Sequence, residues 1–150
     1  MDDFLNQLKI RRITPDDSEA ITRIQTAITK PPVDIDFRHI IEVQLRRDEN
    51  ASFVAELDGK VAGYMISYII YGGFGLEKSA WIATMGVEPK LMGRGIGKRL
   101  AEEIFMVYKQ KGIKHVYTSV RWDSLDLLSF FKTSGFDRSN FINLRKELDV

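Results

Sequence analysis

The chain has 150 residues, of which 44% are hydrophobic and 29% are charged, and its formal net charge is +1. This composition is typical of one globular domain, expected to cover residues 1–150, and the balanced charge gives no reason to expect nucleic acid or a membrane as a partner. The absence of cysteine excludes disulfides and thiol nucleophiles. The two histidines, His39 and His115, are far apart in sequence, which argues against a metal site. Because there is no signal segment and no apolar run of membrane length, we expect a cytoplasmic protein.

The chain opens with a predicted strand followed by a helix. Residues 8–13 form a short strand, and Thr14-Pro15-Asp16-Asp17 is typical of a helix start, with Thr14 or Asp16 as the cap. Apolar residues then recur at helical spacing and mark the buried face of this helix: Ala20, Ile21, Ile24 and Ile28. We expect Pro31 and Pro32 to end it.

A second helix and a hairpin follow. The apolar residues between Phe37 and Leu45 predict the helix. Residues 52–57 and 60–70 predict two strands, because the Asp58-Gly59 pair between them is a strong signal for a tight hairpin turn. A glycine-rich loop at residues 72–75 then precedes the next strand.

The second half of the chain alternates strands and helices. Strands are predicted at residues 80–87, 114–121 and 141–148, and helices at residues 98–111 and 124–134. The full order is β α α β β β α β α β. This order predicts an α/β fold with a mixed sheet, in which a hairpin region comes first and a βαβ crossover follows.

The most informative segment lies between the strand at residues 80–87 and the helix that begins near Lys98. It reads Val-Glu-Pro-Lys-Leu-Met-Gly-Arg-Gly-Ile-Gly-Lys-Arg-Leu from residue 87, with alternating glycines at Gly93, Gly95 and Gly97. The start of a helix leaves about four backbone N–H groups without partners and carries a partial positive charge, and glycine lets a phosphate approach them closely. The segment therefore predicts a cradle for a phosphorylated cofactor, against the alternative of a turn used only for packing.

Two common phosphate-binding motifs do not fit this segment. A P-loop ending at Gly97-Lys98 would need glycine where Met92 stands and a hydroxyl residue where Arg99 stands. The dinucleotide-binding fingerprint needs the spacing Gly-x-Gly-x-x-Gly in the first βα turn, whereas this sequence has Gly-x-Gly-x-Gly late in the chain.

The segment resembles motif A of the GNAT superfamily of acyl-CoA-dependent N-acyltransferases, whose pattern is Val-x-Pro, a few residues, then Gln/Arg-x-x-Gly-x-Gly/Ala. Residues 124–136 resemble motif B of the same family, with the pattern Asn-x-x-Ala-x-x-Phe-Tyr-x-x-x-Gly-Phe. The opening strand and helix and the hairpin are also similar to those of the family, so the resemblance covers nearly the whole chain. It implies a single-domain GNAT-like mixed sheet with splayed central parallel strands.

The resemblance also implies where acetyl-CoA binds, and no metal is implied. The strand that ends at Val87 splays from its parallel neighbour, so that unpaired backbone groups hold the pantetheine arm. Gly86 is then either a bulge residue or a residue that relieves crowding. The implied cofactor-binding residues are Met85, Gly86, Val87, Met92, Gly93, Arg94, Gly95, Ile96, Gly97, Lys98, Ser124 and Phe131. The basic residues Arg94, Lys98 and Arg99 either meet the adenosine 3′-phosphate or are solvated surface charges.

Several positions depart from the family pattern at the expected catalytic site. Phe131 replaces the tyrosine that commonly protonates the departing thiolate, and neither Trp81 nor Ser119 supplies the usual glutamate base. Met92 replaces the opening Gln/Arg of motif A, and Ser124 replaces the asparagine of motif B. The remaining candidates for catalysis are Ser124, Asp123 and Glu77, with Asp34 as a further remote carboxylate.

The function that the resemblance implies is an N-acetyltransferase that moves an acetyl group from acetyl-CoA to an amine by direct attack in a ternary complex. The alternative is a non-catalytic acyl-CoA-binding or regulatory protein on the same scaffold. The expected acceptor is a small-molecule amine or the N-terminal amine of a peptide or protein, and a homodimer is compatible with this interpretation. Acidic residues Asp34 and Asp36 would favour a cationic acceptor. An aromatic wall for it would come from Tyr68, Tyr71, Phe74 and Trp81.

Overall fold

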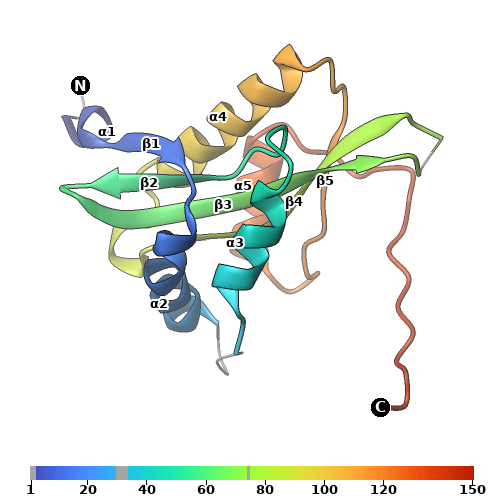
Figure 1. The fold of residues 1–150 in the computed structure, drawn as a ribbon, viewed down its shortest axis with the longest axis horizontal. Coiled ribbons are helices and arrows are strands. Elements are labelled where there is room, and N and C mark those ends of the chain that lie inside the picture. Colours follow the sequence, from blue (N-terminus) through green and yellow to red (C-terminus); the bar gives the residue numbers. More distant parts are fainter. Residues whose placement is uncertain (1–2, 30–33, 74) are drawn as a thin grey trace. The chain divides into compact units, whose positions relative to one another are not determined.

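The computed structural model describes residues 3–29, 34–73 and 75–150, which divide into two compact units, Met1–Thr118 and Ser119–Val150. The first unit holds a five-stranded sheet in the order β1-β2-β3-β4-β5 (Figure 1). Its strands are β1 (Lys9–Arg12), β2 (Phe53–Leu57), β3 (Lys60–Tyr71), β4 (Lys78–Val87) and β5 (Val116–Thr118). Its helices are α1 (Asp3–Gln7), α2 (Ser18–Ile28), α3 (Phe37–Leu45) and α4 (Ile96–Gln110), and the second unit contains α5 (Leu125–Thr133).

The sheet is mixed, as the sequence predicts. The pairs β1–β2, β2–β3 and β3–β4 are antiparallel, whereas β5 pairs with β4 in parallel, with α4 as the crossover between them. The hairpin predicted at Asp58-Gly59 is present, with Leu57 of β2 opposite Lys60 of β3. Within the ranges that the structure describes, no helix is long and apolar enough to cross a membrane.

Helices α2 and α4 cover opposite faces of the sheet. Consecutive residues of a strand point to opposite faces. On β3, the neighbours Gly63 and Tyr64 follow this rule: the Gly63 position lies against Ile96 and Leu100 of α4, whereas Tyr64 packs edge-on against Phe37 of α3, with ring centres 5.8 Å apart. The fully buried residues of the α2–α3 side include Ile21, Ile24, Ile41 and Tyr64.

A buried hydroxyl on α4 fixes this helix to the sheet. The Tyr108 hydroxyl accepts a hydrogen bond from the Ala51 N–H at 3.0 Å and lies 2.7 Å from the Ser67 hydroxyl of β3. The Ser67 hydroxyl also donates to the Ala51 carbonyl. Burial raises the pKa of the Tyr108 phenol, so it stays protonated and available to this network.

The start of α2 is set by Asp17 rather than by Asp16. Thr14 caps a short 3-10 turn at residues 15–17, as predicted, and the Asp17 carboxylate accepts the Thr14 N–H at 2.8 Å and two N–H groups of Arg11 at 2.7 and 2.8 Å. Of the two alternatives for the cap, Thr14 is therefore the correct one, and the Asp16 side chain is almost fully exposed.

Three further expectations need correction. Residues 141–148 form no strand with any described residue, although their apolar pattern predicts one, because a strand also needs a ladder partner. The parallel strand β5 is limited to Val116–Thr118 instead of residues 114–121. Helix α1 has no counterpart among the predicted elements. The expected breakers Pro31 and Pro32 lie outside the described residues.

Candidate functional site

Strands β4 and β5 are paired over only a short stretch before they part. Their parallel ladder joins Ala80 to Val116, Trp81 to Tyr117 and Ile82 to Thr118. Beyond Ile82, β4 continues to Val87 and pairs with β3 on its other side, but no described strand lies beside residues 83–87 toward β5. The predicted splay of the central parallel strands is therefore present, and it leaves one edge of β4 open.

The direction of the backbone groups along this edge follows from the ladder with β3. The Glu88 N–H donates to the Ala62 carbonyl of β3 at 2.8 Å. Because these directions alternate along an antiparallel strand, the backbone groups of Gly86 also point to β3, whereas those of Met85 and Val87 point to the open edge. Met85, Gly86 and Val87 were all expected to present backbone groups to a cofactor. Only Met85 and Val87 do so at the open edge, because the backbone groups of Gly86 point to β3.

The bulge expected at Gly86 is in a different place. Gly86 is in register with Tyr64, and the ladder shifts between Ile66 and Ser67, where Ala83 is the extra residue of β4. Gly86 is instead needed for close packing, because a β-carbon there would lie 3.1 Å from Ile28 Cδ1. The alternative that this glycine relieves crowding is therefore the correct one.

The glycine-rich segment links the open edge of β4 to the start of α4. A 3-10 turn at Pro89–Leu91 leads into it, and Gly93 and Gly95 have φ values of 79° and 93°, a region that residues with side chains rarely adopt. Gly97 already lies inside α4 and is buried. In the part of the chain that the structure describes, none of the backbone N–H groups of residues 93–98 has a hydrogen-bond acceptor. These N–H groups are therefore available as hydrogen-bond donors to a ligand.

The basic residues beside the cradle differ in how they are held. Lys98 is exposed, whereas Arg99 is half-buried and donates through Nη1 to the Leu5 carbonyl at 3.2 Å. The Arg94 guanidinium carbon lies 3.6 Å from the centre of the Phe4 ring. Sequence reasoning missed Phe4 and Leu5, since the five-residue helix α1 is too short for a periodic apolar pattern.

The two candidate bases occupy unfavourable environments. Asp123 is exposed and held by two hydrogen bonds of 2.9 Å from Arg121, which lower the pKa of its carboxyl. Glu77 is exposed in the loop before β4, and at about 3.3 Å per residue it lies roughly 25 Å along the strand from Met85. The lowered pKa makes Asp123 a weak base, and the distance from Met85 places Glu77 far from the open edge of β4.

The other motif B residues lie in the second unit. Ser124 is the N-terminal cap residue of α5, and its side chain makes no capping hydrogen bond. Phe131 is buried, and its ring packs edge-on against Phe130 and Phe136 with ring centres 5.1 and 5.0 Å apart. Ser119, at one of the usual base positions, accepts a hydrogen bond from the Asn143 side chain at 3.1 Å.

The structure brings together part of the expected aromatic wall. Tyr68 and Trp81 are opposite each other in the ladder, and Trp81 is stacked on Tyr117 of β5 with ring centres 5.3 Å apart. Tyr117 was missed because its place beside Trp81 depends on the strand register. Tyr71 belongs to the other face of the sheet, since it lies an odd number of residues after Tyr68. Phe74 lies outside the described residues.

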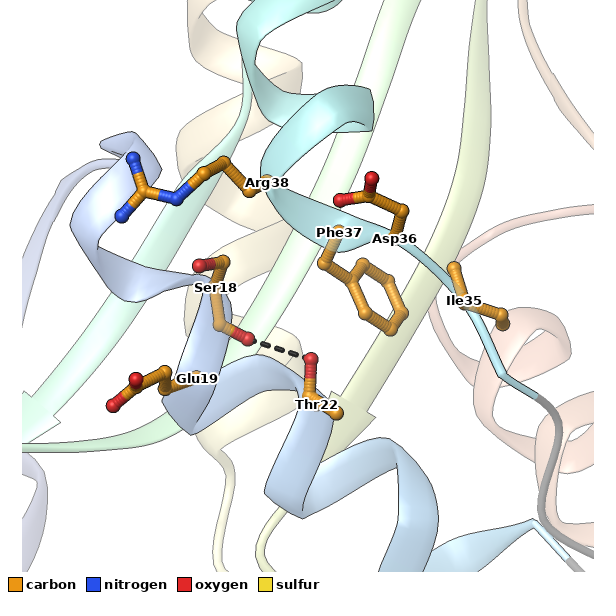
Figure 2. A pocket seen from close by; sticks show the side chains of 7 residues that line it. All are labelled: Ser18, Glu19, Thr22, Ile35, Asp36, Phe37 and Arg38. Atoms are coloured by element: carbon orange, nitrogen blue, oxygen red, sulfur yellow. Dashed lines mark hydrogen bonds between the residues drawn. The ribbon is translucent and has the colours of Figure 1, made fainter.

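A shallow pocket of about 270 Å³ lies where the first turns of α2 and α3 meet (Figure 2). Its lining residues are Ser18, Glu19, Thr22, Ile35, Asp36, Phe37 and Arg38. Asp36 already accepts the His39 N–H at 3.0 Å as the cap of α3, and Thr22 donates to the Ser18 carbonyl at 2.7 Å. Asp36 thus faces a small mixed-charge pocket, while Asp34 is exposed and does not line it.

Comparison with known proteins agrees with this geometry. The model of the acetyltransferase (GNAT) family matches residues 18–136, and the chain belongs to this family. It is 26% identical over 144 residues to an acetyltransferase of Pectobacterium atrosepticum, covering 94% of this chain and 96% of that protein. It is 27% identical over 99 residues to an uncharacterized N-acetyltransferase of Methanocaldococcus jannaschii, covering 65% of this chain but only 44% of that protein.

A solved structure shows the same fold at lower sequence identity. It is an aminoglycoside N-acetyltransferase in complex with CoA, with a TM-score of 0.79 and 17% identity, and the match covers 93% of this chain and 94% of that one. The match confirms the α/β fold with a mixed sheet that the sequence predicts.

Proposed function

We propose that this protein is an N-acetyltransferase that transfers the acetyl group of acetyl-CoA to an amine by direct attack in a ternary complex. One observation carries the proposal: the open edge of β4 is followed, after the short 3-10 turn Pro89–Leu91, by the available N–H groups of residues 93–98. CoA matches this arrangement. Its extended pantetheine arm can pair with the open edge of a strand, and its pyrophosphate can accept hydrogen bonds from clustered N–H groups.

The residues of the first unit fit such a cofactor. The backbone groups of Met85 and Val87 would hold the pantetheine arm, and the amides of residues 93–98 would hold the pyrophosphate, with the positive end of the α4 dipole behind them. A β-carbon at Gly93 would meet no atom within 4 Å, so this side of the loop has room for a ligand. Bound acetyl-CoA supplies an activated thioester carbonyl to the attacking amine.

The acceptor that we propose is a weakly basic amine, either a small molecule or the α-amine of a peptide or protein. No strong base stands at Trp81 or Ser119, and Asp123 is paired with Arg121, so an acceptor that is partly neutral near pH 7 needs the least help. Asp36 in the pocket at the start of α3 would favour a cationic group elsewhere on the acceptor. Ser124 remains a candidate contact from motif B.

A matched pair of substitutions tests the cofactor site. Asparagine and aspartate both tolerate the left-handed conformation of Gly93, and they differ in charge but hardly in shape. We expect Gly93→Asp to weaken CoA binding by more than about tenfold relative to Gly93→Asn, since a carboxylate would repel the pyrophosphate. Isothermal titration calorimetry measures both affinities. Equal affinities in two folded variants would show that the pyrophosphate is not held here.

The alternative, a non-catalytic acyl-CoA-binding protein, is favoured by Phe131, Trp81 and Ser119 at the positions where the family pattern has catalytic residues. Both functions require CoA binding, and only the first requires turnover. Thiol release from acetyl-CoA, measured against a panel of amines, amino acids and peptides, separates them. Release well above hydrolysis with any acceptor supports the enzyme, and tight CoA binding with no release from any acceptor supports the alternative.

A further inference from the structure

The short helix α1 contacts the glycine-rich segment, residues 93–98, which we take as the phosphate-binding segment. The Phe4 ring lies beneath the Arg94 guanidinium, with 3.6 Å between the guanidinium carbon and the ring centre. The Leu5 carbonyl accepts the hydrogen bond from Arg99. The Leu5 side chain covers Gly95, since a β-carbon there would lie 3.3 Å from Leu5 Cδ2. Residues near the N-terminus therefore touch Arg94, Gly95 and Arg99, more than eighty positions later in the sequence.

The contact between Phe4 and Arg94 has a specific consequence for Arg94. A guanidinium stacked on an aromatic face keeps its N–H donors in the plane of the group, where they remain available to other partners. Phe4 itself is 7% exposed and is therefore a fixed platform, whereas Arg94 is exposed. The stacking restricts Arg94 to one orientation without using its hydrogen-bonding capacity.

Arg94 lies in the middle of the segment whose N–H groups are available to a phosphate. Arg94 stands between Gly93 and Gly95, and the amides of all three have no acceptor among the described residues. Planar guanidinium groups bind phosphate oxygens with two parallel hydrogen bonds when they are correctly oriented. Lys98 lies beside the same loop, and among the described residues its ammonium group lies over no aromatic ring, so it serves as an internal reference.

We propose that Phe4 is a positioning residue, which holds Arg94 in the orientation that binds the phosphate groups of CoA. The inference rests on the proposed function, because it takes residues 93–98 as the phosphate-binding segment. It adds α1 to the site and gives its residues a role in affinity for the cofactor. The predicted effect is on binding, so the KM for acetyl-CoA should rise while kcat stays unchanged.

A double-mutant cycle on the full chain tests the proposal. Phe4→Leu keeps an apolar side chain but removes the aromatic face, and Phe4→Tyr keeps both. We expect Phe4→Leu to weaken CoA binding by about two- to fivefold, which is the strength of an exposed cation–π contact, and Phe4→Tyr to restore wild-type affinity. In an Arg94→Gln background the same Phe4→Leu change should have no further effect. In a Lys98→Gln background it should keep its full effect.

Calorimetric titration with CoA reads out each variant, and thermal unfolding checks that each is folded. If Phe4→Leu does not fold, Phe4→Met replaces it in the cycle, because the longer and unbranched methionine side chain adapts to the space that the ring leaves. An equal loss of affinity in the wild-type and Arg94→Gln backgrounds would overturn the proposal, since Phe4 would then act only on the fold. Tighter binding in Phe4→Leu would also overturn it, because α1 would then withhold Arg94 from the cofactor. A wild-type chain that binds no CoA would instead contradict the proposed function itself.

Discussion

Gly86 of β4 lies directly opposite Tyr64 of β3, and the Tyr64 ring fills the space that a side chain at position 86 would need: a β-carbon there would be 2.8 Å from Tyr64 Cε1. Tyr64 is fully buried, so the ring has little room to move away. Ile28 and Ile24 of α2 approach the same position to 3.1 and 3.2 Å, so the missing side chain of Gly86 lets α2 pack closely on β4.

We therefore expect Gly86→Ala to lower the free energy of unfolding by about 1–3 kcal/mol, the usual cost of overpacking a core. Urea denaturation measures the change. Ala83→Ser, at an exposed residue of the same strand, is the control and should be close to neutral. Unchanged stability in Gly86→Ala would mean that α2 can shift to admit the methyl group.

The Asp17 carboxylate should make stability depend on pH. Burial raises its pKa, but the hydrogen bonds from Arg11 and Thr14 outweigh this, and the pKa of Asp17 is lowered overall. A lowered pKa in the folded state stabilises the protein above the unfolded-state pKa of about 3.9, and this contribution is lost as the pH falls through the folded-state pKa. Asp17→Asn should therefore cost about 1–3 kcal/mol at pH 7 and progressively less below about pH 4.

Denaturation with urea at several pH values measures this dependence. Asp16→Asn is a matched control, because the Asp16 side chain is 94% exposed and its nearest cation, Arg38, is 3.6 Å away at the surface. A cost for Asp17→Asn that is equal at neutral and acidic pH would contradict the role of the ionised carboxylate.

Phe131 stands where the family pattern has a tyrosine that protonates the leaving thiolate. If departure of the thiolate limits the rate, Phe131→Tyr should raise kcat and leave the affinity for CoA nearly unchanged. Steady-state kinetics and calorimetry measure the two quantities. Because Phe131 is buried, a hydroxyl without a partner would cost about 1–3 kcal/mol, and thermal unfolding separates this effect from catalysis. An unchanged kcat in the folded variant would show that the thiolate leaves unaided.

The remaining carboxylates should contribute little to deprotonation of the acceptor. Glu77 lies at the far end of β4 from Met85, and Asp123 is held by Arg121. We expect Glu77→Gln and Asp123→Asn each to lower kcat/KM by less than about tenfold. The rate should rise with pH through the acceptor's own pKa, and an α-amine near pKa 8 should react faster at pH 7 than a lysine side chain near pKa 10. A thousandfold loss in either variant, with CoA binding intact, would identify a dedicated base.

Local sequence signals predicted most of the elements because each depends on residues that are close together in the chain. The helix between Phe37 and Leu45 and the hairpin at Asp58-Gly59 follow from apolar spacing and turn chemistry. The segment at residues 141–148 has an equally apolar pattern but no ladder partner in the described chain, and so it is not a strand. Apolar spacing shows which residues favour burial, whereas a strand exists only beside another strand.

The sequence by itself determined the family, the mixed sheet and the glycine-rich segment between β4 and α4, since these depend on spacings within short stretches of chain. Only the tertiary structure decided which groups face a ligand. The alternation of hydrogen bonds to β3 leaves Met85 and Val87 at the open edge and turns Gly86 away from it. The approach of Phe4 to Arg94 likewise joins residues far apart in sequence, and such a contact is set by how the whole sheet packs rather than by any local pattern.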